Sequence, residues 1–195
     1  MKYCILAAGL GSRNNTISGL HKGLLPIHNI PIISHMINKF DSDKEIIIVV
    51  GHLAEQIKSY VSYVHFDKKI KFIEIKKYSG KGSGPGFSLL QCKNELQCPF
   101  VFTPIDTFIE EDIKFDVKKN WIGVVNVPKS ESNKYCLVRG NQNLESIYYG
   151  EGNLAYNGIA GICDYTTFWK ELEKPNLINN EHQVTTAFEK LDNVE

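Results

Sequence analysis

An apolar strand that breaks directly into glycines opens the sequence and constrains the fold more than any other stretch. Residues 3–6 read Tyr-Cys-Ile-Leu, and residues 7–13 read Ala-Ala-Gly-Leu-Gly-Ser-Arg. A glycine-rich turn after a buried strand lets backbone N–H groups approach a phosphate, because no Cβ stands in the way. Arg13, and Lys22 further along, are the cations that a triphosphate site needs. The stretch therefore predicts a phosphate-binding loop after the first strand.

The loop differs from the two most familiar phosphate-binding patterns. It lacks the Gly-Lys-Ser/Thr ending of a P-loop, and the third glycine of the dinucleotide fingerprint would fall at Asn14. An ordinary glycine-rich strand-to-helix turn is the alternative interpretation. The full string with Arg13 and Lys22 disfavours that alternative.

Strand and helix patterns alternate through the first half of the chain. After the first strand, helical patterns cover residues 32–40, 54–63 and 87–96, and strand patterns cover residues 45–50, 71–75 and 99–103. The β-branched run at 45–50 is typical of a parallel strand that is covered on both faces. The alternation predicts an α/β fold with a Rossmann-like, doubly wound, mostly parallel sheet.

Ligands of such sheets lie at the carboxyl ends of the strands. The glycine loop, Gly51-His52, residues 78–86 and Asp106 all follow predicted strands. We therefore expect these segments to meet at one edge of the sheet. A carboxylate at that edge, facing a triphosphate loop, suits Mg²⁺, which prefers one or two carboxylates plus phosphate oxygens and water. A helix N-cap or a turn is the alternative role for Asp106.

Composition excludes several classes of protein. The 195 residues carry 22 acidic and 22 basic side chains, so nothing indicates a nucleic-acid partner or an anionic membrane. The apolar runs fall short of the roughly 18 residues of a membrane span. The apolar stretch at the start of the sequence is too short for the hydrophobic region of a signal peptide. The five cysteines are odd in number, widely spaced and without a Cys-x-x-Cys pair, which favours a reducing cytoplasm and no zinc site. A homo-oligomer is left open.

The string Leu-Ala-Ala-Gly-x-Gly-x-Arg, followed by a lysine before an apolar stretch, resembles the nucleotidyltransferase superfamily (sugar-nucleotidyltransferase-like). Its members make activated sugars and alcohols from an NTP and a phosphomonoester. The usual family form has Pro-Lys, whereas His21-Lys22 looks more like the phosphocholine cytidylyltransferase branch. The whole chain is also similar to a cytidylyltransferase of bacterial capsule phosphoramidate synthesis, which joins CTP to L-glutamine phosphate.

The resemblance implies a role for each matching position. Arg13 and Lys22 would be catalytic and hold phosphates, and Asp106 would bind Mg²⁺. The nucleotide would contact the first loop and the turn before the helix at 87–96, through Leu6, Ala7, Ala8, Gly9, Gly11, Ser12, Gly82, Ser83 and Gly84. For residues 78–86 the alternative is a mobile surface loop.

The second half of the chain is richer in strand patterns, at residues 121–127, 135–139, 145–149 and 157–163, with helices expected at 165–173 and 181–191. The strands are expected as antiparallel additions over the acceptor site. Asn157 and Gly158 resemble the Asn-x-Gly-Ile strand of the family and would bind the acceptor, with plain packing as the alternative. We expect one domain over 1–195, with a nucleotide-binding half at 1–110 and an acceptor-binding half at 111–195.

The function implied by the resemblance is nucleotidyl transfer. CTP and a small phosphomonoester, either L-glutamine phosphate or a phosphocholine-like compound, would give a CDP-linked product and pyrophosphate for bacterial capsule or surface polysaccharide modification. The alternatives are a sugar-1-phosphate nucleotidyltransferase using UTP, GTP or dTTP, and a non-catalytic nucleotide-binding module. A glycosyltransferase is disfavoured because its Asp-x-Asp match, Asp41-Ser42-Asp43, precedes a strand.

One family feature has no match. Many relatives carry a second metal-binding Asp in a Trp-x-Asp-x-Gly motif, which the sequence lacks. A shortened chain, a substitute residue and a more loosely held metal are the open explanations.

Overall fold

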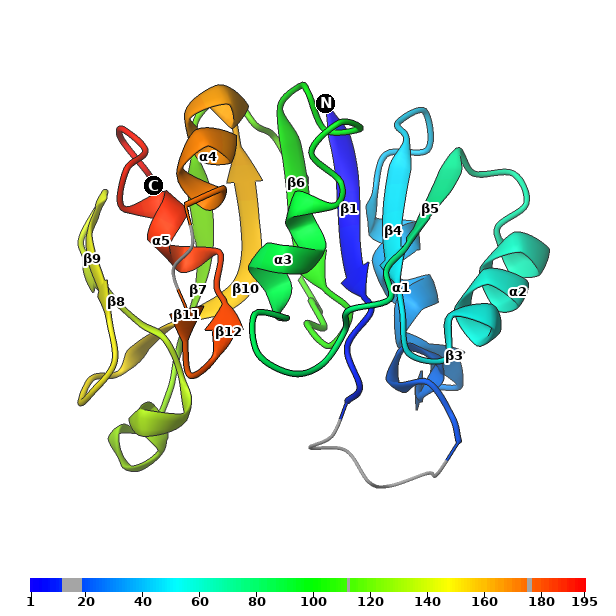
Figure 1. Ribbon diagram of the computed structural model, residues 1–195, viewed down its shortest axis with the longest axis horizontal. Helices are drawn as coiled ribbons and strands as arrows, with labels where there is room; N and C mark the ends of the chain where they lie inside the picture. The colour runs from blue at the N-terminus through cyan, green and yellow to red at the C-terminus, as the bar shows by residue number, and fades with distance from the viewer. Residues whose placement is uncertain (12–18, 112, 175–176) are drawn as a thin grey trace.

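The computed structural model describes residues 1–11, 19–111, 113–174 and 177–195 (Figure 1). Its main sheet has eight strands in the order β5-β4-β1-β6-β10-β8-β9, with β7 also paired to β10. The strands are β1 Lys2–Ala7, β4 Ile46–Val50, β5 Ile70–Glu74, β6 Phe100–Pro104, β7 Trp121–Asn126, β8 Leu137–Gly140, β9 Leu144–Tyr148 and β10 Leu154–Ile162. The helices are α1 Ile32–Lys39, α2 Ala54–Val64, α3 Pro85–Leu90, α4 Tyr165–Leu172 and α5 Thr185–Phe188.

The sheet joins a parallel part to an antiparallel part. Strands β5, β4, β1 and β6 are parallel, whereas β10 runs antiparallel to β6, β7 and β8. The α/β prediction with a parallel sheet and antiparallel additions is confirmed. No helix in the described ranges combines the length and apolar character needed to cross a bilayer.

Helices cover both faces of the sheet because the residues of β1 alternate between two cores. Cys4 and Leu6 pack into the core shared with α3, α4 and α5, and Tyr3, Ile5 and Ala7 into the core shared with α1 and α2. Figure 1 shows α3, α4 and α5 in front of the sheet and α1 behind it. All five residues of β4 are buried, as a strand covered on both faces requires.

Two short hairpins and two 3₁₀ turns complete the described chain. Strand β2 (Pro26–Ile27) pairs with β3 (Ile30–Pro31), and β11 (Leu177–Ile178) pairs with β12 (Glu181–His182). The turns are η1 (Lys22–Leu24) and η2 (Lys129–Lys134). Lys22 therefore begins a 3₁₀ turn instead of standing directly before a strand.

The helix expected over residues 181–191 was wrong. Asn179 and Asn180 have φ values of 52° and 65°, so they form the tight turn of the β11–β12 hairpin. Asparagine tolerates this left-handed conformation, and two such residues in succession favour a hairpin turn. The helix begins only at Thr185 and ends at Phe188.

Candidate active site

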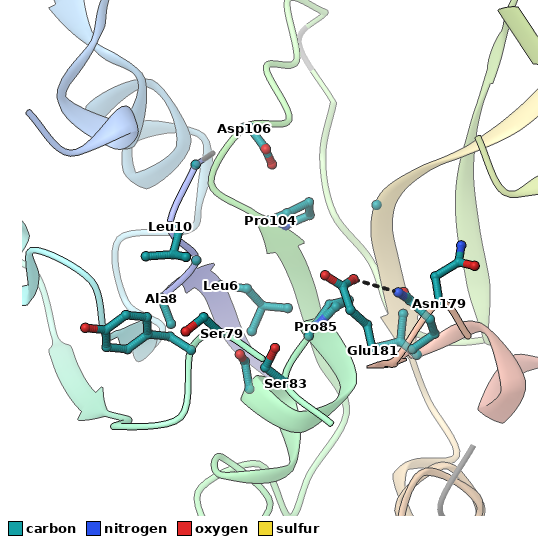
Figure 2. A pocket seen from close by; sticks show the side chains of 18 of the residues that line it. Leu6, Ala8, Leu10, Ser79, Ser83, Pro85, Pro104, Asp106, Asn179 and Glu181 are labelled. Carbon is teal, nitrogen blue, oxygen red and sulfur yellow. Dashed lines mark hydrogen bonds between the residues drawn. The ribbon is translucent and has the colours of Figure 1, made fainter. Parts of the chain in front are cut away.

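A pocket of about 860 Å³ opens at the carboxyl ends of β1 and β6 (Figure 2). Nine of the residues predicted from the sequence line it: Leu6, Ala8, Gly9, Gly11, Lys22, Ser83, Gly84, Asp106 and Gly158. Ala7, Gly82 and Asn157 are not among the lining residues. Ser12 and Arg13 lie outside the described residues.

An ion pair joins the two charged residues that the sequence singled out within the described chain. Lys22 Nζ donates to Asp106 Oδ2 at 2.8 Å, although the two residues are 84 positions apart. Lys22 begins η1, and Asp106 follows β6, so the fold brings a 3₁₀ turn and the end of a strand together. The Asp106 side chain is 52% exposed and that of Lys22 21%, so the pair is open to a ligand from the pocket side.

The glycine loop leaves room for the lysine stem. Gly11 has a φ of +66°, and a Cβ at this position would lie 3.3 Å from Cδ of Lys22. Gly9 has open space where a Cβ would be. Backbone at these positions is therefore accessible from the pocket, as a phosphate-binding loop requires.

His21 fixes the backbone on which Lys22 stands. Its Nε2 lies 2.9 Å from the carbonyl oxygen of Ala7, and its Nδ1 accepts the N–H of Gly23 at 3.0 Å. The backbone N–H of His21 donates to Oε1 of Gln56 at 2.8 Å. One neutral tautomer satisfies both ring contacts, donating from Nε2 and accepting at Nδ1. Burial lowers the pKa of the His21 imidazole from its ordinary 6.5, opposed by the bond to Ala7, and the nearby Lys22 charge lowers it further.

Replacing His21 with alanine is expected to lower the free energy of unfolding by about 1–3 kcal/mol, because buried backbone groups lose their partners. The pKa of His21 is lowered in the folded protein, so the unfolded chain takes up the proton first as pH falls below 6.5. Wild-type stability should therefore decrease as the pH falls from neutral through 6.5, and less steeply in the variant. Denaturant unfolding at a series of pH values measures both effects.

The matched control is His28→Asn, which removes an exposed histidine at a φ of 49° that asparagine tolerates. It should change neither stability nor its pH dependence by a comparable amount. A His21→Ala protein as stable as wild type, with an unchanged slope against pH, would show that the ring does not hold this segment. Burial also lowers the pKa of His65, so this residue should contribute to the slope that remains in the variant.

The glycine-rich loop at residues 78–86 is bonded to the β11–β12 hairpin. Gly82 N–H donates to the carbonyl of Asn180 at 2.7 Å, and His182 N–H donates to the carbonyl of Ser83 at 2.7 Å. A Cβ at Gly84 would lie 2.8 Å from the carbonyl oxygen of His182, so the two segments are in close contact. The hairpin brings to the pocket residues that the sequence analysis did not single out: Asn179, Asn180, Glu181 and Gln183.

A bulge in β10 brings backbone to the pocket. The register shifts between Tyr156 and Ala160, and Gly158 there has a φ of +101°. A Cβ at Gly158 would lie 2.6 Å from Cγ of Pro104, so the glycine permits the contact between β10 and the end of β6. The Asn157 side chain accepts the N–H of Ile159 through Oδ1 at 3.1 Å. That bond stabilises the bulge itself.

The Asp-x-Asp match lies at the other end of the sheet. Asp41 Oδ2 accepts the hydroxyl proton of Tyr3 at 3.0 Å, near the amino end of β1. Asp43 pairs with Lys44 at 2.6 Å. Neither carboxylate lines the pocket.

Comparison with known families identifies the family of the chain. The sequence model of one protein family, the MobA-like NTP transferase domain, matches residues 3–114 of the chain. The chain belongs to the MobA-like NTP transferase family. The match spans the strands and loops that place Lys22 and Asp106 at the pocket of this NTP transferase.

Two curated relatives each match about two thirds or more of this NTP transferase. The bifunctional protein GlmU of Methanococcus vannielii is 33% identical over 135 residues, which are 68% of this chain and 31% of the relative. GlmU of Methanococcus aeolicus is 30% identical over 148 residues, 73% of this chain and 34% of the relative. The chain therefore spans about a third of the length of these curated relatives.

Solved structures share the fold at lower identity. CTP:phosphocholine cytidylyltransferase from Streptococcus pneumoniae gives a TM-score of 0.74 at 21% identity, covering 89% of this chain and 76% of that one. UDP-glucose pyrophosphorylase from Acinetobacter baumanii gives a TM-score of 0.74 at 16% identity, covering 96% of this chain and 81% of that one. At these identities the likeness supports the NTP transferase fold alone.

The donor groups of the pocket suit a metal that takes most of its ligands from substrate and water. Within the described ranges, no group of three or more His, Cys, Asp and Glu side chains is placed to hold a metal ion. Asp106 offers a half-exposed carboxylate beside the glycine loop. Mg²⁺ binds in this way, through one or two carboxylates plus phosphate oxygens, so the residues present fit it.

Proposed function

We propose that this NTP transferase joins CTP to a small phosphomonoester and releases pyrophosphate. The observation that carries the proposal is the Lys22–Asp106 pair, set beside an open glycine loop in a pocket of about 860 Å³. Known small-molecule sites measure roughly 300–1,000 Å³, so a pocket near the upper end has room for a nucleotide and an acceptor together. Residues 1–110 would form the nucleotide-binding half and residues 111–195 the acceptor-binding half.

The proposed reaction is a direct in-line displacement. An oxygen of the acceptor phosphate attacks the α-phosphorus of CTP, the bond between the α-phosphorus and its bridging oxygen breaks, and pyrophosphate leaves with that oxygen. The attacking phosphate is already an anion, so positioning and electrostatics carry the catalysis. Lys22 would hold the α-phosphate and the acceptor, and Arg13 the leaving pyrophosphate. Bound at Asp106, Mg²⁺ would neutralise charge on the phosphate oxygens.

The identity of the substrates is inferred from the His21-Lys22 sequence and from the comparisons. The His21-Lys22 sequence and the fold likeness to a cytidylyltransferase favour CTP with L-glutamine phosphate or a phosphocholine-like acceptor, in a cytoplasmic step of capsule or surface polysaccharide modification. The similarity to GlmU and to UDP-glucose pyrophosphorylase favours the alternative, a sugar-1-phosphate with UTP, GTP or dTTP. A binding module without catalysis is the alternative from another class.

A matrix of substrates separates these possibilities. Four NTPs are each combined with L-glutamine phosphate, phosphocholine and glucose-1-phosphate in the presence of Mg²⁺, and pyrophosphate is measured. The proposal predicts release with CTP and one of the first two acceptors. Release of pyrophosphate only with the sugar-1-phosphate would support the alternative, a sugar-1-phosphate nucleotidyltransferase. Thermal stabilisation by nucleotide without pyrophosphate in any combination would identify a binding module.

A further inference from the structure

The pocket carries charge of both signs, and the charges come from different elements. The charged residues among its described lining are Lys22, Lys81, Asp106 and Glu181. Asp106 is paired with Lys22 at 2.8 Å, whereas the recorded bond of Glu181 is to the neutral amide of Gln183, at 3.0 Å. Figure 2 shows the Glu181 side chain extending from β12 toward the pocket. A carboxylate in this wall repels the phosphates of a nucleotide, so Glu181 suits another part of the bound substrates.

The position of Glu181 is set by its surroundings. The backbone bonds on both sides of it, from Gly82 to Asn180 and from His182 to Ser83, fasten β12 to the glycine-rich loop at 2.7 Å each. A Cβ at Gly84 would lie 3.0 Å from Cβ of Glu181, so the loop packs against this residue directly. A carboxylate has about four lone-pair sites, so the bond from Gln183 leaves further acceptor capacity.

An aromatic side chain accompanies the carboxylate. Tyr156 lines the same pocket, and its ring is fixed by a hydroxyl bond to the carbonyl of Gly158 at 2.7 Å and an edge-to-face contact with Phe188 at 5.4 Å. A carboxylate with a tyrosine ring in the same pocket suits an organic cation, which is attracted both to negative charge and to aromatic faces.

We propose that Glu181 recognises a cationic amino or ammonium group on the acceptor. The pocket would then select acceptors that carry this positive charge over acceptors that lack it, such as sugar phosphates. This inference rests on the proposed function, because it places the acceptor in the pocket that holds the nucleotide. The two ends of the pocket would then bind groups of opposite charge. Phosphates lie toward Lys22, and the amine lies toward β12. Glu181 is a specificity residue and takes no part in bond breaking.

The test compares Glu181→Gln with wild type on two ligand pairs that differ in one positive charge. The pairs are phosphocholine with 3,3-dimethylbutyl phosphate, and L-glutamine phosphate with its analogue lacking the α-amino group. Calorimetry in the presence of a non-hydrolysable CTP analogue measures binding without turnover. Wild type should prefer the charged member of one pair by about 10- to 100-fold, because Glu181 attracts the positive charge that the other member lacks. The variant should lose that preference and keep its affinity for the CTP analogue.

The matched control is Glu173→Gln, which removes a surface carboxylate that pairs with Lys93 and does not line the pocket. It should keep the wild-type preference. The inference is overturned if Glu181→Gln retains the preference, if wild type binds both members of each pair equally, or if wild type binds none of the four. Loss of the preference in a protein that releases no pyrophosphate would support the inference while refuting the proposed reaction.

Discussion

Replacing Lys22 with alanine is expected to lower kcat for pyrophosphate release by about 100- to 1000-fold, because one preorganised donor to developing charge contributes roughly 2.7–4 kcal/mol. Lys22 is the described cation that the fold places between the glycine loop and Asp106, with its stem against Gly11. The effect should fall mainly on kcat, since the interaction is strongest in the transition state. Steady-state kinetics with CTP and the acceptor identified by the substrate matrix measures it.

The control for this variant is Lys93→Ala. Lys93 forms an ion pair with Glu173 at 2.6 Å, outside the pocket, so its loss removes a surface ion pair of similar length. Such pairs contribute at most about 1 kcal/mol to stability and nothing to this chemistry. Near-normal turnover by Lys22→Ala would refute the catalytic assignment of the lysine.

Asp106→Asn should lower kcat by at least about 100-fold, because a metal that it helps to hold supplies several kcal/mol of charge stabilisation. Asparagine keeps the size of the side chain and its ability to accept a hydrogen bond from Lys22. The loss would therefore follow from the missing charge. Pyrophosphate release measured over a range of Mg²⁺ concentrations should show a higher Mg²⁺ requirement for the variant.

Asp43→Asn is the control for the second variant. Asp43 is an exposed, ion-paired carboxylate of the Asp-x-Asp match, outside the pocket. Its replacement should leave turnover and Mg²⁺ dependence unchanged. If Asp43→Asn abolished activity while Asp106→Asn did not, the metal would bind near Asp43, at the opposite end of the sheet from the pocket. The glycosyltransferase interpretation requires that result.

Local patterns were sufficient to predict the parallel sheet. The β-branched run of β4 is buried along its whole length, and the apolar residues of β1 alternate between the two cores. The rule that ligands lie at the carboxyl ends of parallel strands then placed the glycine loop and Asp106 at one edge. No tertiary contact was needed for that step, because strand direction alone fixes which edge a following loop joins.

The remaining features depend on contacts between distant segments. The sequence indicates His21 only as a family variant, because its bonds to Ala7 and Gln56 require three separate segments to meet. The Asn179-Asn180 pair was the available signal for the β11–β12 hairpin, and the helical pattern of the following apolar residues obscured it. The preferences of two asparagines at a turn decided the structure there.

A crystal structure with CTP and Mg²⁺ would show directly where the nucleotide and the metal bind. We expect the triphosphate between the backbone of Gly9 to Gly11 and the amino group of Lys22, with Asp106 on the metal. A nucleotide bound elsewhere, with the ion pair of Lys22 and Asp106 facing an empty pocket, would contradict it.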